Sequence, residues 1–156
     1  MNEDKLIKVL FAFHSDALEE WTIETLWCET VDQEKGHYKI ENIPFYAPFA
    51  YNDLVFAEYD ENEGMLTYRE TVAFSGHSTI QVVLMDKEAS STNEIITMLE
   101  ALGAEIEKFS DGYFVIDISP NLNYKPINDK LKNLAEKEII DYAESCLDDQ
   151  HQFQIT

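Results

Sequence analysis

Three adjacent residues, His14, Ser15 and Asp16, are the residue types of a hydrolase triad. A triad needs a nucleophile within hydrogen-bond reach of a base, and a third group that orients the base. Sequence neighbours cannot adopt this geometry together, so we expect an exposed turn at these residues. The G-x-S-x-G elbow of many hydrolases is also absent from the sequence. The sequence therefore predicts no catalytic residue and favours a binding protein over an enzyme.

The sequence also predicts no metal and no cofactor. The four histidines, at positions 14, 37, 77 and 151, are far apart and form no H-x-x-H or H-x-H pair. The acidic segment 60–64 departs from the calcium-loop pattern, and all five glycines are isolated, as in turns or helix caps. Cys28 and Cys146 are expected to be free thiols, because a chain of this length builds a core without disulfides.

Residues 75–79, Ser-Gly-His-Ser-Thr, are the most site-like segment. Their hydroxyls and backbone N–H groups could bind a small ligand, and His77 could titrate near neutral pH. The alternative is a tight junction whose hydroxyls bond to the local backbone. The predicted ligand site comprises Asn42, Asp53, Ser75, His77 and Ser78.

An aromatic loop at 45–49 and an acidic segment after it form a second candidate surface. Tyr46 and Phe49 could anchor a protein partner, because interface hot spots favour aromatic residues. The loop could instead cap the core of the first half. The predicted partner surface comprises Tyr46, Phe49, Tyr51, Glu58, Asp60, Glu61 and Glu63.

Charge decides which partners are plausible. The chain has 31 acidic and 11 basic residues, a net charge of −20, and the acidity is spread over both halves. Nucleic-acid binding is not expected, because it relies on Lys and Arg at the phosphates. A basic protein partner is favoured by complementary fields, although acidity can also serve solubility alone. With no apolar stretch long enough for a membrane span and no signal-peptide pattern, we expect a soluble cytoplasmic protein without membrane contact.

The first half, residues 1–75, predicts β structure. Alternating apolar residues and turn signals indicate five strands, at 5–13, 21–28, 38–41, 54–59 and 65–73. In the second strand, Trp21, Ile23, Thr25 and Trp27 share one face, and Thr22, Glu24, Leu26 and Cys28 share the other. Short strands with tight turns suggest a small barrel or a bent antiparallel sheet.

The second half, residues 76–147, changes to mixed structure. We expect a strand at 78–85, a helix opened by a Ser91–Glu94 capping box, strands at 104–109 and 113–118, and a helix near 126–134. Segment 138–147 could continue that helix, but a strand is preferred. The order β-α-β-β-α-β is the ferredoxin-like pattern. Residues 148–156 are expected to be a polar, frayed tail. The fold class is thus α+β, with the first half packed against the second.

Several blocks span nearly the whole chain and together resemble one family. They are KVLF, ETLWCE, HYKIENIPFYA, YNDLVFAE, SGHSTIQVVL, LEALGAEIE and DYAESCL. On these blocks the chain resembles a bacterial family known only as domain of unknown function 4265. This resemblance implies a compact protein of the same architecture and no particular activity. The family pattern often has asparagine at the position of His77, which weighs against this histidine as a catalytic base.

Two functional hypotheses follow from the sequence. The first is an acidic immunity or inhibitor protein that neutralises a basic bacterial toxin such as a nuclease. The second is a small-ligand-binding or regulatory domain with its site where the two halves join. The oligomeric state is not predicted.

Overall fold

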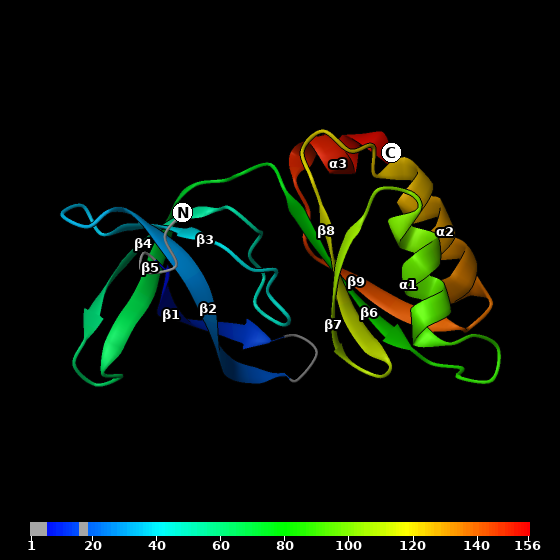
Figure 1. Cartoon of the computed structure of the whole chain (residues 1–156), viewed down its shortest axis with the longest axis horizontal. Helices are drawn as coiled ribbons and strands as arrows, with labels where there is room; N and C mark the ends of the chain where they lie inside the picture. The colour runs from blue at the N-terminus through cyan, green and yellow to red at the C-terminus, as the bar shows by residue number, and fades with distance from the viewer. Residues whose placement is uncertain (1–5, 16–18) are drawn as a thin grey trace. The chain divides into compact units, whose positions relative to one another are not determined.

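The computed structural model describes residues 6–15 and 19–156, and the chain forms two compact units (Figure 1). The first unit is Met1–Ser75 and the second is Gly76–Thr156. Each unit has its own sheet and its own hydrophobic core. The predicted packing of one half against the other stays a prediction.

The sheet of the first unit is a closed five-stranded barrel in the order β1-β2-β3-β4-β5. Its strands are β1 (Leu6–Ser15), β2 (Glu20–Asp32), β3 (His37–Ile40), β4 (Leu54–Asp60) and β5 (Met65–Ala73). A parallel pairing at Leu10 and Thr67 joins the first and last strands, while the other pairs are antiparallel. Of the two predicted forms, the barrel is therefore the one that occurs.

Period-two alternation fills the barrel, because every second side chain of a strand points inward. The buried core consists of Val9, Phe11, Leu26, Cys28, Tyr38, Ile40, Val55 and Ala57. The same alternation corrects one prediction: His14 and Ser15 lie in β1, and not in an exposed turn. Asp16, the third residue of the supposed triad, and Lys5 lie outside the described residues.

The turn between β2 and β3 is fixed by its sequence. The Lys35 N–H donates to Oδ1 of Asp32 (3.1 Å), the Asx-turn bond that aspartate commonly makes. Gly36 follows with a φ of +73°, and a Cβ there would come 2.8 Å from the carbonyl oxygen of Ala57. Only glycine meets both requirements, which explains why the turn ends at this residue.

The second unit has the predicted element order β-α-β-β-α-β, followed by one further helix. Its elements are β6 (Ser78–Leu84), α1 (Thr92–Glu100), β7 (Glu105–Ser110), β8 (Tyr113–Ile118), α2 (Lys125–Glu136), β9 (Ile140–Cys146) and α3 (Asp149–Gln154). The four strands form one sheet in the order β7-β8-β6-β9. The Ser91–Glu94 capping box is confirmed, and so is the preferred strand within 138–147.

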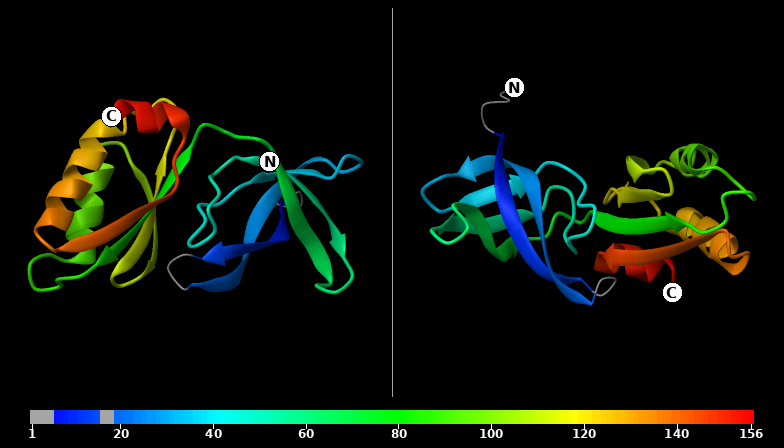
Figure 2. Two further views of the ribbon diagram at one scale, coloured as in Figure 1. Left: turned by 180° about the vertical axis from the view of Figure 1, so that it is seen from behind. Right: turned by 90° about the horizontal axis from the view of Figure 1, so that it is seen from below.

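Helices α1 and α2 cover one face of this sheet (Figures 1 and 2). The helices contribute Ile95, Leu99, Ile127, Leu131 and Leu134 to a buried cluster that also contains Ile80, Val82, Phe114 and Ile116 from the strands. These helical residues recur every three or four positions, so burial in the sheet, and not helix propensity alone, fixes both helices.

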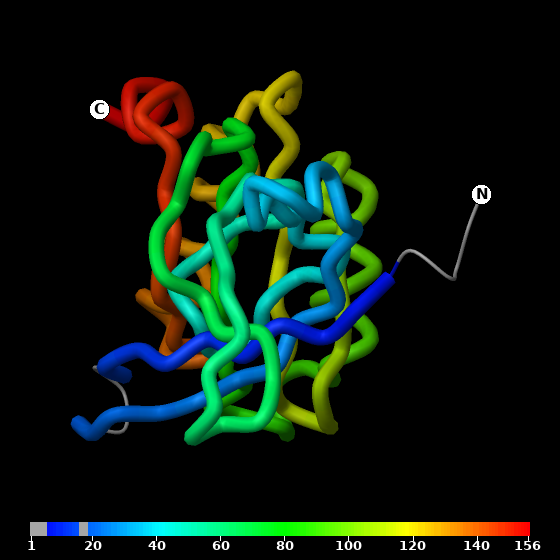
Figure 3. The backbone as a smooth tube through the Cα atoms, turned by 90° about the vertical axis from the view of Figure 1, so that its left-hand side faces the viewer, coloured from blue at the N-terminus to red at the C-terminus, as the bar shows by residue number. Residues whose placement is uncertain are grey.

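The expected frayed tail is wrong. Residues 149–154 form helix α3, which follows β9 at the C-terminal end of the chain (Figure 3). Asp148 caps this helix by accepting the N–H of Gln150 (3.0 Å), and His151 is completely buried. The segment has little apolar periodicity, which is why the sequence pattern indicated a tail.

Candidate functional site

The three predicted site residues of the first unit hold its long loop in place. Asp53, only 1% exposed, accepts the N–H of Ser75 (2.9 Å) and the N–H of Ala50 (3.1 Å) through its two carboxylate oxygens. The Ser75 hydroxyl donates to the carbonyl of Tyr51 (2.7 Å). The structure therefore brings Asp53 and Ser75 together, in bonds that order the loop after β3.

Asn42 works in a different place on the same loop. Its Oδ1 accepts the N–H of Trp27 (2.7 Å), and its Nδ2 donates to the carbonyl of Ile43 (3.3 Å). These bonds continue the pairing of β2 beyond the end of β3. Asn42 thus acts as a strand-like partner for β2, and no bond joins it to Asp53 or Ser75 in the contacts above.

Glu24 is a loop anchor that the sequence analysis overlooked. Its carboxylate accepts three consecutive backbone N–H groups, those of Phe45 (2.8 Å), Tyr46 (3.1 Å) and Ala47 (2.8 Å). The only sequence signal was an acidic residue on the inward face of β2. Three donors on one carboxylate make a strong, charge-assisted anchor for the aromatic loop.

The aromatic residues of this loop have different environments. Phe49 packs on Phe11 and Tyr68, with ring centroids 5.0 and 4.7 Å away. Tyr46 is 37% exposed, and Tyr51 is partly buried. The geometry of Phe49 favours the alternative in which the loop caps the barrel core.

In the second unit, His77 forms a pair with a residue that the sequence analysis overlooked. Nδ1 of His77 lies 2.8 and 3.0 Å from the two carboxylate oxygens of Asp117. Asp117 is 5% exposed, and burial raises the pKa of its carboxyl, although His77 opposes that shift. A buried carboxylate that orients an imidazole is an arrangement found in many functional sites.

Ser78 forms a different pair, with His151 of helix α3. Its Oγ lies 2.6 Å from Nδ1 of His151, and Nε2 of that ring lies 2.9 Å from the carbonyl of Ser119. Since a carbonyl can only accept, Nε2 carries the proton, and the Ser78 hydroxyl donates to Nδ1 of the neutral ring. Ser78 Oγ also accepts the Asp148 N–H (2.8 Å).

The Ser78–His151 pair has the distance of a nucleophile and its base, but both residues are 0% exposed. All the polar atoms named above already have partners inside the unit. The arrangement satisfies buried polar groups and ties α3 to β6, so it gives no support to nucleophilic catalysis.

A further buried polar cluster lies between α2 and β9. The Tyr124 hydroxyl donates to Oε2 of Glu144 (2.6 Å), and Nδ2 of Asn128 donates to the same oxygen (3.3 Å). Burial first, and then the bond to Glu144, raise the pKa of Tyr124. A tyrosine that stays neutral is suited to donating a permanent hydrogen bond, so this cluster stabilises the helix–strand contact.

The predicted acidic surface is the β4–β5 hairpin. Glu58, Glu61 and Glu63 are exposed, and Asp60 is partly buried. Arg69, the only arginine of the sequence, donates from Nε to Glu58 (3.1 Å) and from a terminal nitrogen to Asp60 (3.0 Å). The bond from Arg69 is the main cause of the lowered pKa of Asp60.

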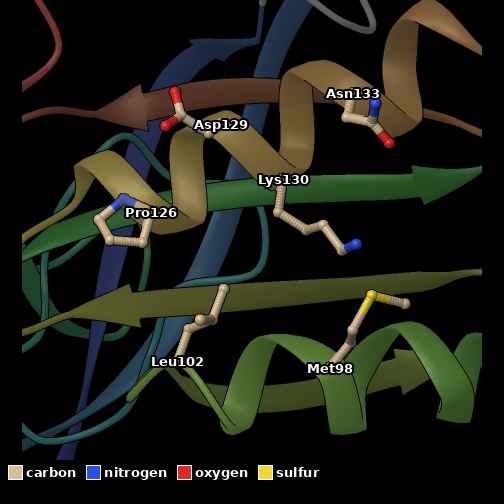
Figure 4. Close-up of a pocket in the computed structure, with 6 residues that line it drawn as sticks. All are labelled: Met98, Leu102, Pro126, Asp129, Lys130 and Asn133. Atoms are coloured by element: carbon tan, nitrogen blue, oxygen red, sulfur yellow. The ribbon is translucent and has the colours of Figure 1, made fainter.

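A groove of about 460 Å³ lies between helices α1 and α2 (Figure 4). Met98 and Leu102 point into it from α1, and the Lys130 side chain extends over it from α2. Pro126, Asp129 and Asn133 complete its lining. Apart from Lys130, its inward side chains are apolar, and the predicted site residues do not line it.

Comparison with known proteins gives a family and a fold. A family model described as "Domain of unknown function (DUF4265)" matches residues 24–142. The chain belongs to the DUF4265 family. The matched range contains all the residues predicted for the ligand site and the partner surface, whereas His151 lies beyond it. No curated protein matches the chain.

A solved structure has the same fold as this DUF4265 chain. It is described as "Novel crystal structure of a hypothetical protein from Neisseria gonorrhoeae", and it aligns with a TM-score of 0.79 and 24% sequence identity. The alignment covers 92% of this chain and 96% of that one. At this identity the likeness concerns the fold.

Two searches of the structure bear on its chemistry. Among residues 6–15 and 19–156, no group of three or more histidine, cysteine or acidic residues is placed to hold a metal ion. Within the same described ranges, no helix has the length and apolar character of a membrane span. The most site-like polar arrangements of this DUF4265 domain are therefore the His77–Asp117 pair and the β4–β5 hairpin.

Proposed function

We propose that the protein is a non-enzymatic binding protein that captures a basic protein partner, in the manner of an immunity protein that neutralises a bacterial nuclease. The observation that carries this proposal is the β4–β5 hairpin, where Tyr59 is 63% exposed among acidic neighbours. Four carboxylates, those of Glu58, Asp60, Glu61 and Glu63, surround it with Arg69 as the bonded counter-charge.

The physical support is charge matching around an aromatic anchor. A nuclease attracts phosphate with a basic cleft, so an acidic hairpin can occupy that cleft competitively. Acidic side chains at the rim speed the encounter, and a central tyrosine can supply much of the binding energy. The net charge of −20 acts in the same direction over the whole molecule.

The test is affinity capture with purified variants. The tagged protein is incubated with lysate of its host at low salt and at about 0.15 M salt, and retained proteins are identified by mass spectrometry. We expect one basic protein in stoichiometric amount at both salts. Tyr59→Ala should then weaken the purified complex by about tenfold or more, as for a hot spot.

A charge-matched control separates the hairpin from net charge. Glu61→Gln with Glu63→Gln removes two charges from the hairpin, and Glu100→Gln with Glu136→Gln removes two from exposed positions of the helices. The first pair should slow association roughly fivefold, and the second should leave it nearly unchanged. If no basic partner is retained at either salt, the proposal is wrong.

A second candidate function rests on the His77–Asp117 pair. The element order and the strand order β7-β8-β6-β9 support a ferredoxin-like arrangement of the second unit, and a small regulatory ligand could bind beside His77. His77→Gln should then weaken binding of a metabolite found by thermal-shift screening, and leave partner capture unchanged. Capture lost in His77→Gln would speak against this separation.

A further inference from the structure

The outer face of β1 and β2 carries an apolar surface that the proposed function does not use. The exposed tryptophans, Trp21 and Trp27, both lie on it, with exposed fractions of 75% and 46%. Ile23 lies between them on β2 and is 61% exposed. On β1, Ala12 is paired opposite Ile23 and is also exposed. We call these four residues, with Lys8 and His14, the tryptophan face.

Two basic or titratable side chains complete the tryptophan face. Nζ of Lys8 lies 5.1 Å from the ring centroid of Trp27, within the range of a cation–π contact. The ring of His14 meets the ring of Trp21 edge-on at 6.0 Å. Lys8 and His14 pair in register with these same tryptophans across the two strands.

No carboxylate interrupts this face. Its outward positions run from the Lys8–Trp27 pair to the His14–Trp21 pair, and they hold Lys8, Leu10, Ala12, His14, Trp21, Ile23, Thr25 and Trp27. Acidic residues make up 31 of the 156 residues, so an acid-free stretch of this length contrasts with the rest of the chain.

The exposed area suits the core of an interface. An aromatic side chain offers about 150–250 Å² for burial, so the exposed parts of Trp21, Trp27 and Ile23 amount to roughly 400 Å². A standard interface buries about 800 Å² on each partner, with an apolar centre and a polar rim. Apolar patches of this size on a monomer usually mark an interaction surface.

Charge identifies the occupant. A basic protein would meet Lys8 here, whereas the acidic hairpin offers it four carboxylates. A second copy of this chain is repelled by the acids elsewhere on its surface, and the tryptophan face is where two such copies can touch without opposing carboxylates. We propose that two copies of this chain associate through the tryptophan face. Contact of the same patch with itself forms a closed, two-fold symmetric dimer.

The test is the mass of the full-length protein in solution. We expect sedimentation velocity at about 0.15 M salt to give dimers of the 18.1 kDa chain as the concentration rises through the micromolar range. Trp21 and Trp27 are the only tryptophans of the sequence, so their fluorescence should shift to shorter wavelengths over the same concentrations.

Matched substitutions test the surface itself. Ile23→Glu places a carboxylate at the centre of the face in both copies, and it should raise the dimer dissociation constant at least tenfold. Val72→Glu is the control, because Val72 is an exposed strand residue of β5 outside the face, and its dimer should persist. Circular dichroism checks that both variants are folded, and Trp21→Ser serves as a second variant of the face.

The inference stands apart from the proposed capture of a basic partner, since the two use different residues. A wild-type chain that remains monomeric at about 100 μM would overturn it, because dimers of even weak affinity form at that concentration. A dimer that persists unchanged in both Ile23→Glu and Trp21→Ser would overturn it equally.

Discussion

Oγ of Ser78 lies 2.6 Å from Nδ1 of His151, although 73 positions separate these residues in the sequence. The bond joins the first residue of β6 to the short C-terminal helix α3. A helix of six residues is not stable alone, because helix nucleation costs more than so few hydrogen bonds return. Helix α3 therefore depends on this buried anchor.

Ser78→Ala should destabilise the second unit by about 1–3 kcal/mol, because it leaves Nδ1 of His151 and the Asp148 N–H without their partner in a buried place. The measurement is urea unfolding followed by circular dichroism. Ser145→Ala is the control, since it removes a longer, 3.2 Å bond to the Thr79 carbonyl and should cost less than about 1 kcal/mol. Equal losses in both variants would contradict the anchoring role.

Glu24 should hold the aromatic loop through its three backbone bonds. In Glu24→Ala we expect the amides of Phe45, Tyr46 and Ala47 to exchange their hydrogens about tenfold faster or more, because local opening no longer breaks those bonds. Nuclear magnetic resonance reads each amide separately. The Ala50 amide, which bonds to Asp53 instead, is the internal control and should keep its rate. Unchanged exchange at residues 45–47 would show that another contact holds the loop.

Phe49 and Tyr46 should differ strongly in their contribution to stability. Phe49→Ala removes a ring that packs on Phe11 and Tyr68, and it should lower the free energy of unfolding by about 3 kcal/mol. Tyr46→Ala trims an exposed side chain and should change it by about 0.5 kcal/mol or less. Denaturant unfolding measures both. A small effect of Phe49→Ala would favour the partner-anchor hypothesis for this residue.

The sequence predicts those parts of the fold that local patterns specify. Alternation in β1 and β2 and the capping box at Ser91 involve residues within a few positions of each other, and these predictions were confirmed. Helix α3 was missed because its anchor is a single histidine whose partners, Ser78 and Ser119, lie far away in sequence. No periodicity carries such information.

The same distinction applies to the candidate sites. His77 was singled out from its type and its neighbours, but its buried partner Asp117 is 40 positions away and became evident only from the strand pairing of β6 with β8. Asp53 and Ser75 were grouped correctly, yet their bonds to the loop could not be read from the sequence. Long-range bonds of this kind depend on the register of the sheets.

The two cysteines should react very differently. Cys28 is fully buried in the barrel, and burial, with a smaller contribution from Glu41, raises the pKa of its thiol to about 12. Since the thiolate is the reactive form, only about one Cys28 in ten thousand is reactive at pH 8, before access is considered. Cys146 is partly exposed. Native protein should therefore show one reactive thiol at pH 8, and Cys146→Ser should show none until guanidinium unfolds it.

The raised pKa of Cys28 also makes stability depend on pH. In the unfolded chain this thiol ionises at its ordinary pKa of about 9, whereas in the folded protein it stays protonated until about pH 12. Unfolding thus releases a proton above pH 9, so the stability that Cys28 contributes is complete below pH 9 and is lost as the pH rises toward 12. The midpoint of urea unfolding should fall over this interval more steeply in the wild type than in Cys28→Val, which has no thiol to ionise. Parallel curves for the two proteins would mean that the Cys28 thiol ionises equally well in the folded and unfolded chains.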